Sequence, residues 1–453
     1  MPYSVPDSLL IPVETLNREF DGKLLLALCA AEHGLPAIIG GRTSMHERLP
    51  ALPRSIYLSK DVRSASRRVF RLLEALGHTI VALDEEALAR FDDDLFLKQI
   101  DPDAFPRARV LFAWGEANAA VWRQSQWYTG APIITSGNPR TDMMRMELRP
   151  FHAPEIASLK DRFGDFVLFN SNFGVVNHFI PGQTRFRVAD WVPPEDVDEF
   201  RAGFLRHRRA LFEHFLALIP SLSLAIAPRT LVVRPHPSED AEAWREVAKD
   251  LPNVAVVHEG SVVPWLAAAS VLIHNGCTSA VEAAAIGTPA LAFRPVLSDT
   301  FDVHLPNSLS ENYSEAEALI ERARAIAAGA AAPLTDDRRA ILAHHLAGLD
   351  GALSSERIVA ALVEQRSALS KAPGASWQSR MRGRLDHAKR RLRTRLRDRR
   401  RRESTSAYMS HKFPGIGVRS VQERIGRFQR TLGRFEGMQA REIEKDIFEI
   451  RKA

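Results

Sequence analysis

The residues best suited to chemistry form a short, proline-rich turn. Arg234-Pro235-His236-Pro237-Ser238 follows Thr230–Val233, which has the composition of a β-strand. In open α/β sheets the carboxyl ends of the strands face the ligand. Arginine and histidine there can donate hydrogen bonds to phosphate, and the prolines restrict where the histidine points. The turn predicts a nucleotide-phosphate site that uses Arg234, His236 and Ser238; the alternative is a surface turn that contains a histidine.

A second phosphate-binding signal lies in Ile273–Ala283. The pattern indicates a strand, a turn of small residues and the start of a helix. A helix N-terminus offers unpaired N–H groups and the positive end of its dipole to an anion. The alternative is a capped βα unit in which Thr278 acts only as the N-cap. The expected nucleotide contacts, with the last residue reaching a ribose hydroxyl, are Asn275, Thr278, Ser279 and Glu282.

Carboxylates in the N-terminal part are candidates for acid–base chemistry. Glu19 lies where the first predicted strand passes into a helix, and Glu85 and Glu86 follow the strand predicted at Thr79–Asp84. A carboxylate at a strand end can act as general base or nucleophile in sugar transfer. Glu19 is the first candidate and Glu85 the second. The alternative is that these acids only complement helix dipoles.

Two other polar segments follow in this part of the chain. Asn138 and Arg140 come after the strand predicted at Pro132–Gly137 and are expected to line the ligand cleft. The alternative is a turn with proline at the first helical position. The acidic run Asp92–Asp94 resembles a metal-binding motif, but its neighbours do not form a clear strand end. We interpret this run as a solvated loop or a helix start.

Several motifs are missing from the sequence, and each absence disfavours a class of protein. No G-x-G-x-x-G follows the first strand, which disfavours nicotinamide and flavin dehydrogenases. No G-x-x-x-x-G-K-[ST] occurs, which disfavours P-loop ATPases. H-E-x-x-H and clustered Cys/His sets are also missing, so zinc is not expected. We expect an enzyme without cofactor or metal.

The elements that must position these residues alternate between β and α, which is typical of mostly parallel sheets covered by helices. The sequence predicts an α/β fold of two Rossmann-like domains, at residues 1–150 and 165–370, and a basic helical tail at 371–453. The polar stretch at about 149–164 is the expected boundary. Predicted strands are 9–13, 37–41, 55–60, 79–84, 110–115, 132–137, 166–172, 230–234, 254–258, 271–274 and 290–293.

Length and charge agree with this organisation. A chain of 453 residues suits two domains with an appendage. The net charge of +6 is uneven, because residues 380–402 hold 13 basic and two acidic side chains. That segment carries +11, which leaves −5 for the rest of the chain. The high isoelectric point therefore concerns the tail and its partners rather than the body.

The basic segment also has a narrow apolar stripe. Leu385, Leu392 and Leu396 recur at helical spacings of seven and four, a pattern suited to a helix lying on a bilayer. Arg390–Arg397 contains no aromatic residue for bases to stack on, so nucleic acid is not an expected partner. We expect residues 380–402 to bind an anionic membrane surface; the alternative is a solvated charged linker.

The expected location is the inner face of the cytoplasmic membrane, as a peripheral protein. The first residues lack a secretory-signal pattern, and the two cysteines suit a reducing compartment. No run of 18 apolar residues occurs; the best candidate, Leu24–Ala31, is cut short by Glu32 and His33.

Seven segments of the chain carry a resemblance to a known family: Asn17–Asp21, Leu83–Glu86, Gly137–Asp142, Asn170–Phe173, Val233–Pro237, His274–Ser279 and Lys412–Pro414. Together they resemble bacterial surface-carbohydrate biosynthesis proteins for capsule or O-antigen, within the GT-B-like glycosyltransferases. The resemblance extends from about residue 10 to 415. The His-Pro turn and the small-residue helix start are also similar to those of transferases that use CMP-activated sialic acid or Kdo, and of enzymes that transfer glycerol phosphate from CDP-glycerol.

This resemblance implies a metal-independent glycosyltransferase. It would move a sugar from a nucleotide-activated, CMP-linked donor to a growing surface polysaccharide or lipid-linked glycan. Three alternatives stay open: a sugar-nucleotide 2-epimerase-like enzyme, a CDP-glycerol-type polyol-phosphate transferase, and an inactive scaffold that binds glycan or membrane.

Overall fold

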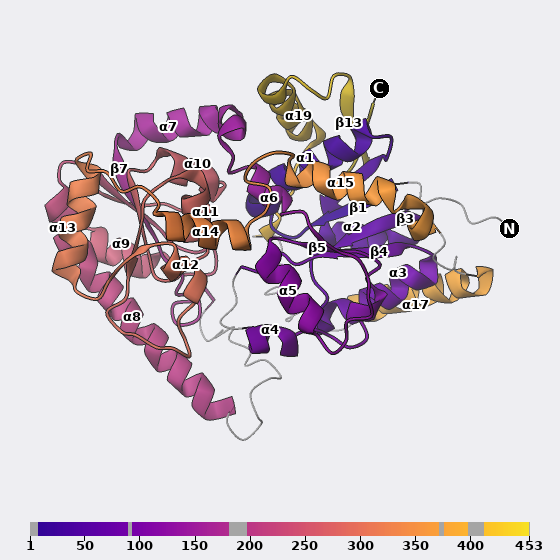
Figure 1. The fold of residues 1–453 in the computed structure, drawn as a ribbon, viewed down its shortest axis with the longest axis horizontal. Coiled ribbons are helices and arrows are strands. Elements are labelled where there is room, and N and C mark those ends of the chain that lie inside the picture. Colours follow the sequence, from indigo (N-terminus) through magenta and orange to yellow (C-terminus); the bar gives the residue numbers. More distant parts are fainter. Residues whose placement is uncertain (1–7, 89–92, 181–196, 371–375, 397–411, 453) are drawn as a thin grey trace. The chain divides into compact units, whose positions relative to one another are not determined.

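The computed structural model describes residues 8–88, 93–180, 197–370, 376–396 and 412–452. The chain forms two α/β units (Figure 1). Unit 1 comprises residues 1–87, 100–151 and 345–453, and unit 2 comprises residues 88–99 and 152–344. The main passage between the units falls after Phe151, inside the predicted boundary. The two Rossmann-like domains expected from the sequence are confirmed by their parallel sheets, described next.

Unit 1 is built on a sheet of eight strands in the order β13-β14-β2-β1-β3-β4-β5-β6. The six strands from β2 to β6 in this order are parallel and correspond to the six predicted N-terminal strands. Their bounds are β1 Ser8–Val13, β2 Ala37–Gly41, β3 Ser55–Ser59, β4 Thr79–Leu83, β5 Leu111–Ala113 and β6 Ile133–Thr135.

The central helix of unit 1 is α1 (Leu16–Glu32), and its apolar run Leu24–Ala30 is buried. One face of the sheet, α1, α15 (Ser354–Glu364) and α19 (Val418–Leu432) share one hydrophobic core. A Cβ atom at Gly22 would lie 2.6 Å from the Pro139 carbonyl oxygen. Gly22 therefore allows α6 (Pro139–Asp142) to approach α1 closely. Other helices here are α2 Arg42–Arg48, α3 Arg67–Leu76, α5 Glu116–Gln124, α16 Arg366–Ser370 and α17 Trp377–Leu396.

The C-terminal part differs from the predicted separate helical tail. Residues 345–453 belong to unit 1, so the domain limits 165–370 and 371–453 are corrected. After α17 and α19 the chain forms an antiparallel hairpin of β13 (Met438–Glu444) and β14 (Ile447–Lys452), and β14 pairs with β2. Phe448 and Ile450 are fully buried, and this contribution to the core explains why the segment joins the sheet.

Unit 2 contains a parallel sheet of six strands in the order β12-β11-β10-β7-β8-β9. The five strands predicted here are present, and β12 was not predicted. Their bounds are β7 Phe166–Asn170, β8 Thr230–Arg234, β9 Val254–Val256, β10 Val271–His274, β11 Ala290–Phe293 and β12 Glu311–Tyr313.

Alternate residues of each strand point to opposite faces of this sheet. On one face, Val167 and Phe169 pack with α8 (Val197–Ile226), α9 and α13. On the other face, Phe166 and Leu168 pack with α7, α10 and α11. The remaining bounds are α4 Asp93–Lys98, α7 Ala153–Phe163, α9 Glu242–Ala248, α10 Val262–Ala268, α11 Ser279–Ile286, α12 His304–Ser308, α13 Ala316–Ala327 and α14 Asp336–His345.

Among the described residues, α8 is the one helix long and apolar enough to span a membrane. Its residues Phe215, Leu218 and Leu222 are buried in the core of unit 2. A core helix in contact with several aromatic side chains is expected to have this composition, so we interpret α8 as part of the unit 2 fold.

Candidate functional site

Three loops of unit 2 begin side by side at the carboxyl edge of its sheet. Strand β7 lies between β10 and β8, and Asn170 is the register partner of both His274 and Arg234. The two predicted nucleotide-binding segments therefore leave the same edge, on either side of the loop after β7. This is the edge at which parallel α/β sheets bind ligands.

The Arg-Pro-His-Pro turn is held by a buried carboxylate, Glu239. Its Oε1 accepts hydrogen bonds from the backbone N–H groups of His236 and Phe173, both at 3.0 Å, and from the Ser171 hydroxyl at 2.8 Å. Its Oε2 accepts from Trp244 Nε1 at 3.1 Å. Burial raises the pKa of Glu239, although these bonds act against the rise. Sequence reasoning missed Glu239; the only available signal was its place directly after the turn.

His236 is exposed, and Ser238 orients its ring. The backbone N–H of Ser238 donates to His236 Nδ1 at 3.2 Å, and the Ser238 hydroxyl lies 2.8 Å from the same nitrogen. An Nδ1 that accepts the N–H bond leaves Nε2 as the protonated, donating nitrogen of the neutral ring. Ser238 thus acts on His236 within the turn.

Arg234 lies at the end of β8 and is partly buried. One of its terminal nitrogens donates to the Gly260 carbonyl at 2.9 Å. Burial lowers the pKa of Arg234 to about 10, while the Glu282 carboxylate acts in the opposite direction. The guanidinium is therefore still charged at neutral pH. The opposing effect of Glu282 also shows that this residue of α11 lies near Arg234.

His274 and Gly276 shape the turn after β10. His274 is fully buried; its Nδ1 accepts the Gly276 N–H at 3.0 Å, and its Nε2 lies 2.8 Å from the Ser310 hydroxyl. Burial lowers the pKa of His274 to about 3, so the ring is neutral and structural. Gly276 has φ +81°, in the left-handed region that favours glycine. The turn then leads into α11.

Several buried polar atoms at this edge have no hydrogen-bond partner among the described residues. Both amide atoms of Asn275 are in this state, as are Asn170 Oδ1 and Arg234 Nε. Thr278 precedes α11 without making a side-chain capping hydrogen bond. Buried polar groups are normally paired, and leaving one unpaired costs free energy. The edge therefore has the properties of a site that a polar ligand or water completes.

A second basic residue, Arg208 of α8, lies at the same edge and was not singled out from the sequence. Its guanidinium donates to the Asn172 carbonyl and lies 5.0 Å from the Phe173 ring centre. Burial lowers the pKa of Arg208 to about 10, and the Glu239 carboxylate opposes that effect. No motif surrounds Arg208 in the sequence, because its partners come from loops distant along the chain.

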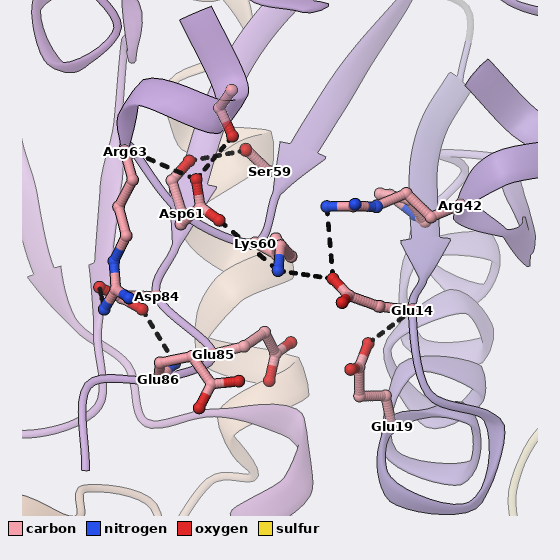
Figure 2. Close-up of polar contacts among 12 residues, drawn as sticks. Glu14, Glu19, Arg42, Ser59, Lys60, Asp61, Arg63, Asp84, Glu85 and Glu86 are labelled. Atoms are coloured by element: carbon pink, nitrogen blue, oxygen red, sulfur yellow. Dashed lines mark hydrogen bonds and ion pairs between the residues drawn. The ribbon is translucent and has the colours of Figure 1, made fainter. Parts of the chain in front are cut away.

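In unit 1, the candidate carboxylates gather around a buried lysine, Lys23. Lys23 Nζ lies 2.8 Å from Glu19 Oε2 and 3.0 Å from Glu85 Oε1. The Glu14 N–H also donates to Glu19 Oε2, at 3.0 Å. All three charged side chains are almost fully buried. Figure 2 shows Glu85 in the loop after β4 and Glu19 in the first turn of α1, with Glu14 above Glu19. Lys23 was missed, although a lysine four residues after Glu19 in an apolar helix was a usable signal.

These charges stabilise one another. Burial alone would raise the pKa of Glu19, but the charges of Lys23 and Arg18 outweigh it and hold the pKa well below its usual range. Burial likewise acts to lower the pKa of Lys23, and Glu19 and Glu85 reverse this effect and raise it. Glu19 Oε1 accepts no hydrogen bond within the described residues and lies 3.6 Å from Arg18. Glu19 is therefore ionised, with one oxygen anchored and the other without a donor.

The other predicted residues of unit 1 join this cluster. Asn138 Nδ2 donates to Glu85 Oε2 at 3.3 Å, and its Oδ1 accepts the Arg140 N–H at 2.8 Å. Glu86 is more exposed, at 39% of its side chain, and pairs with Arg18 at 2.8 Å. Burial acts to raise the pKa of Glu86, but Arg18 outweighs it and lowers the pKa. The Arg140 guanidinium lies 5.5 Å from the Trp114 ring centre.

Beside this cluster, Glu14 is in contact with three cations, of which Figure 2 shows Lys60 and Arg42. It lies 2.5 Å from Lys60, 2.7 Å from Lys412 and 3.3 Å from Arg42. Burial acts to raise the pKa of Glu14, but the three cations outweigh it and lower the pKa strongly. The Lys412–Pro414 segment of the resemblance thus contacts the carboxyl edge of unit 1.

Two acidic segments singled out in the sequence lie at the starts of helices. Helix α4 begins at Asp93, in agreement with a helix start, while Asp92 lies outside the described residues. Asp142, in the Gly137–Asp142 segment, accepts hydrogen bonds from the N–H groups of Ser354 and Ser355 at 2.6 and 2.9 Å. Asp142 therefore caps the N-terminus of α15.

No protein-family model and no curated protein sequence matches this chain. Its fold is similar to that of the wall teichoic acid polymerase TagF soaked with CDPG, at 10% identity and TM-score 0.48, over 80% of this chain and 89% of that one. It is also similar to UDP-GlcNAc 2-epimerase from Methanocaldococcus jannaschii, at 14% identity and TM-score 0.47, over 79% of this chain and 99% of that one. It is likewise similar to UDP-GlcNAc 2-epimerase from Neisseria meningitidis, at 13% identity and TM-score 0.48, over 79% of this chain and 100% of that one. The parallel sheets of the two units themselves show the Rossmann-like fold.

Proposed function

We propose that this protein is a glycosyltransferase that moves a sugar from a nucleotide-activated donor to a surface polysaccharide or lipid-linked glycan. The observation that carries the proposal is the group of unpaired polar atoms at the carboxyl edge of unit 2. Asn275 and Arg234 supply these atoms beside the N-terminus of α11. The phosphate oxygens and ribose hydroxyls of a nucleotide have the hydrogen-bonding groups needed to satisfy them.

In this proposal each predicted residue of unit 2 has a role toward the donor. Arg234 and His236 donate to the phosphates, and Ser238 keeps His236 in the form that donates through Nε2. Asn275, Thr278 and Ser279 bind the nucleotide at the start of α11, and Glu282 accepts from a ribose hydroxyl. The cations and the helix dipole stabilise the leaving phosphate without a metal. We propose a CMP-linked donor on the basis of the resemblance in the His-Pro turn.

Unit 1 would supply the base and hold the acceptor. We propose that Glu19 takes the proton from the acceptor hydroxyl while the hydroxyl oxygen attacks the anomeric carbon and the nucleotide phosphate leaves. Glu19 Oε2 is fixed by Lys23 and Glu14, while Oε1 has no hydrogen-bond donor in the described structure. A base needs such an accepting oxygen within reach of the proton it removes. Glu85 is the second candidate, and Glu86 is a third with a more exposed carboxylate.

Product analysis tests this function. The protein is incubated with CMP-, CDP- and UDP-activated donors and a glycan or lipid-linked acceptor, and the products are analysed by mass spectrometry. An acceptor that gains the mass of a sugar supports the proposal. An isomerised donor sugar would instead indicate an epimerase, and transfer of polyol phosphate would indicate the CDP-glycerol type of enzyme. No change to any donor would indicate a binding scaffold.

We also propose that α17 attaches the protein to an anionic membrane surface. The side of α17 that carries Gly383 packs on α3, where a Cβ atom at Gly383 would lie 3.2 Å from Ala75 Cβ. At 100° per residue, Trp377, Leu385 and Leu392 fall on the opposite side of the helix. Their side chains are 75%, 53% and 59% exposed. A cationic helix with an exposed apolar stripe is suited to the membrane interface. The side chain of Leu396 and residues 397–402 lie outside the described structure.

Co-sedimentation with vesicles tests the attachment. We expect binding to phosphatidylglycerol vesicles at low salt, and release at high salt because salt screens the charges. The double substitution Leu385→Ser and Leu392→Ser should weaken binding, whereas Leu224→Ser, at an 81% exposed leucine of unit 2, should not. Equal binding to neutral phosphatidylcholine vesicles, or binding to neither, would contradict the proposal.

A further inference from the structure

A cavity of about 220 Å³ opens at the carboxyl edge of the unit 1 sheet. It lies where β2 and β3 end, next to the first turn of the helical segment 64–76. It is separate from the Lys23 cluster, because none of Glu19, Lys23 and Glu85 lines it. The lining residues are Arg42, His46, Tyr57, Ser59, Lys60, Ala65, Ser66, Arg68 and Val69.

The charged residues that line the cavity, Arg42, Lys60 and Arg68, are all cationic. Glu14 pairs with Arg42 and Lys60 from outside the lining, but it also pairs with Lys412. Asp61 lies 3.7 Å from Lys60. Two carboxylates thus face four cations, and this part of unit 1 has a surplus of positive charge that favours an anion.

The neutral groups of the cavity are held in place. Ser66 donates to Asp61 Oδ1 at 2.6 Å, and His46 Nε2 lies 2.6 Å from the Tyr57 hydroxyl. Burial lowers the pKa of His46 to about 3, so this ring adds hydrogen-bonding capacity without charge at neutral pH. The N-terminal end of the helical segment adds its positive dipole end. The cavity is thus a fixed, polar and electropositive enclosure.

We propose that this cavity is a second anion site that binds a phosphate group, separate from the donor site of unit 2. Water occupies about 30 Å³ per molecule in the liquid, so the volume admits a phosphate with a short polyol attached. The cavity lies close to α17, because His387 of that helix contacts the Glu47 carbonyl at 3.1 Å and α17 packs on α3. This phosphate would belong to the acceptor at the membrane surface, an identification that rests on the proposed function.

Titration with inorganic phosphate and with glycerol 3-phosphate, followed by calorimetry at constant ionic strength, tests the site. The His236→Ala variant serves as background, because it weakens the donor site of unit 2. Arg68→Ala is the informative change, since Arg68 lines the cavity, is exposed and makes no ion pair with Glu14. A lost charge-assisted hydrogen bond is expected to weaken phosphate binding about ten- to hundredfold. Arg71→Ala, on the same helix but outside the cavity, should leave phosphate binding unchanged.

Phosphate binding that is equal in Arg68→Ala and its background would overturn the proposal, as would the absence of binding. Glycerol 3-phosphate binding that saturating CMP abolishes completely in the unaltered protein would do so too, because no binding would then remain outside the donor site. A competition assay with vesicles that contain phosphatidic acid identifies the source of the phosphate. Competition between these vesicles and glycerol 3-phosphate supports a lipid headgroup, and its absence supports a soluble phosphate. If no nucleotide binds but phosphate does, the proposed function fails and this site remains.

Discussion

The carboxyl edges of the two sheets are built alike and filled differently. In unit 1 the charged groups of the buried cluster neutralise one another, with Lys23 between Glu19 and Glu85. In unit 2 the edge includes polar atoms of Asn275 and Asn170 that have no partner in the described structure. Both edges follow parallel strands, so the backbone does not account for the difference. The difference lies in the side chains and in what each edge requires from a ligand.

Substitutions at the two edges are expected to have different effects on stability and binding. Removing one partner of a buried ion pair leaves an uncompensated charge and destabilises the fold. Removing a group that has no protein partner costs little stability but takes a contact from the ligand. Substitutions in the unit 1 cluster should therefore affect stability and the chemical step, whereas substitutions at the unit 2 edge should affect binding.

The largest expected effect is on the rate of sugar transfer, where substitutions of Glu19 and Glu85 in unit 1 should differ most. Glu19→Gln is expected to reduce the rate of sugar transfer by about 10²–10⁴-fold, the usual contribution of a general base. Glu85→Gln is the matched control, because it also removes one carboxylate from Lys23 and leaves the other. Turnover by both variants, measured at saturating donor, separates the two roles.

The two variants also define the contrary outcomes. A larger loss in Glu85→Gln would move the base to Glu85. Equal, small losses in both would show that the pair with Lys23 is only structural, and Glu86→Gln would then be examined in the same assay.

Stability should respond most to the loss of the shared cation. Lys23→Met leaves Glu19 and Glu85 buried without their partner and is expected to lower the free energy of unfolding by about 3–5 kcal/mol. Urea denaturation measures this change. Combining Lys23→Met with Glu19→Gln and Glu85→Gln should recover part of the loss, since no uncompensated charge is then buried. An unchanged midpoint in Lys23→Met would contradict the account of the cluster.

The pH dependence of stability should reveal the buried histidine of unit 2. The pKa of His274 is about 3 in the folded protein, below the value of about 6.5 in an unfolded chain. The unfolded state therefore takes up the proton first, and stability falls as the pH decreases from about 6.5 toward 3. The slope is at most about 1.4 kcal/mol per pH unit for this group. His274→Asn should reduce the slope between pH 6.5 and 4 in urea titrations; an identical slope would contradict this assignment.

The smallest expected change in stability concerns Asn275. Because its amide has no hydrogen-bond partner in the described structure, Asn275→Ala should alter the free energy of unfolding by less than about 1 kcal/mol. The same substitution should weaken nucleotide binding about tenfold, which calorimetry can measure. A variant that is strongly destabilised would show that Asn275 has a structural partner after all.

Much of the fold could be predicted from the sequence, because short apolar runs end in turns rich in glycine or proline. Strands β8, β10 and β11 match their predicted residues. The strand β12 and the hairpin β13–β14 were missed, because β12 (Glu-Asn-Tyr) has no apolar run and the hairpin is rich in charged residues.

The site was predictable where its residues are adjacent in the sequence. The turns around His236 and Asn275 follow their strands and could be recognised. Glu239 and Arg208 could not, because their importance comes from burial and from partners on other elements. The cavity near Arg68 likewise combines residues from separate elements, none of which has a distinctive motif.

A nucleotide titration of the unaltered protein and two variants tests whether the carboxyl edge of unit 2 binds the nucleotide of the donor. CMP, CDP and UDP are titrated by calorimetry into the unaltered protein, His236→Ala and Glu19→Gln. We expect that at least one nucleotide binds the unaltered protein and that His236→Ala weakens its affinity about ten- to hundredfold. Glu19→Gln, in the other unit, should bind with unchanged affinity. Unchanged affinity in His236→Ala, or no binding of any nucleotide, would contradict the claim.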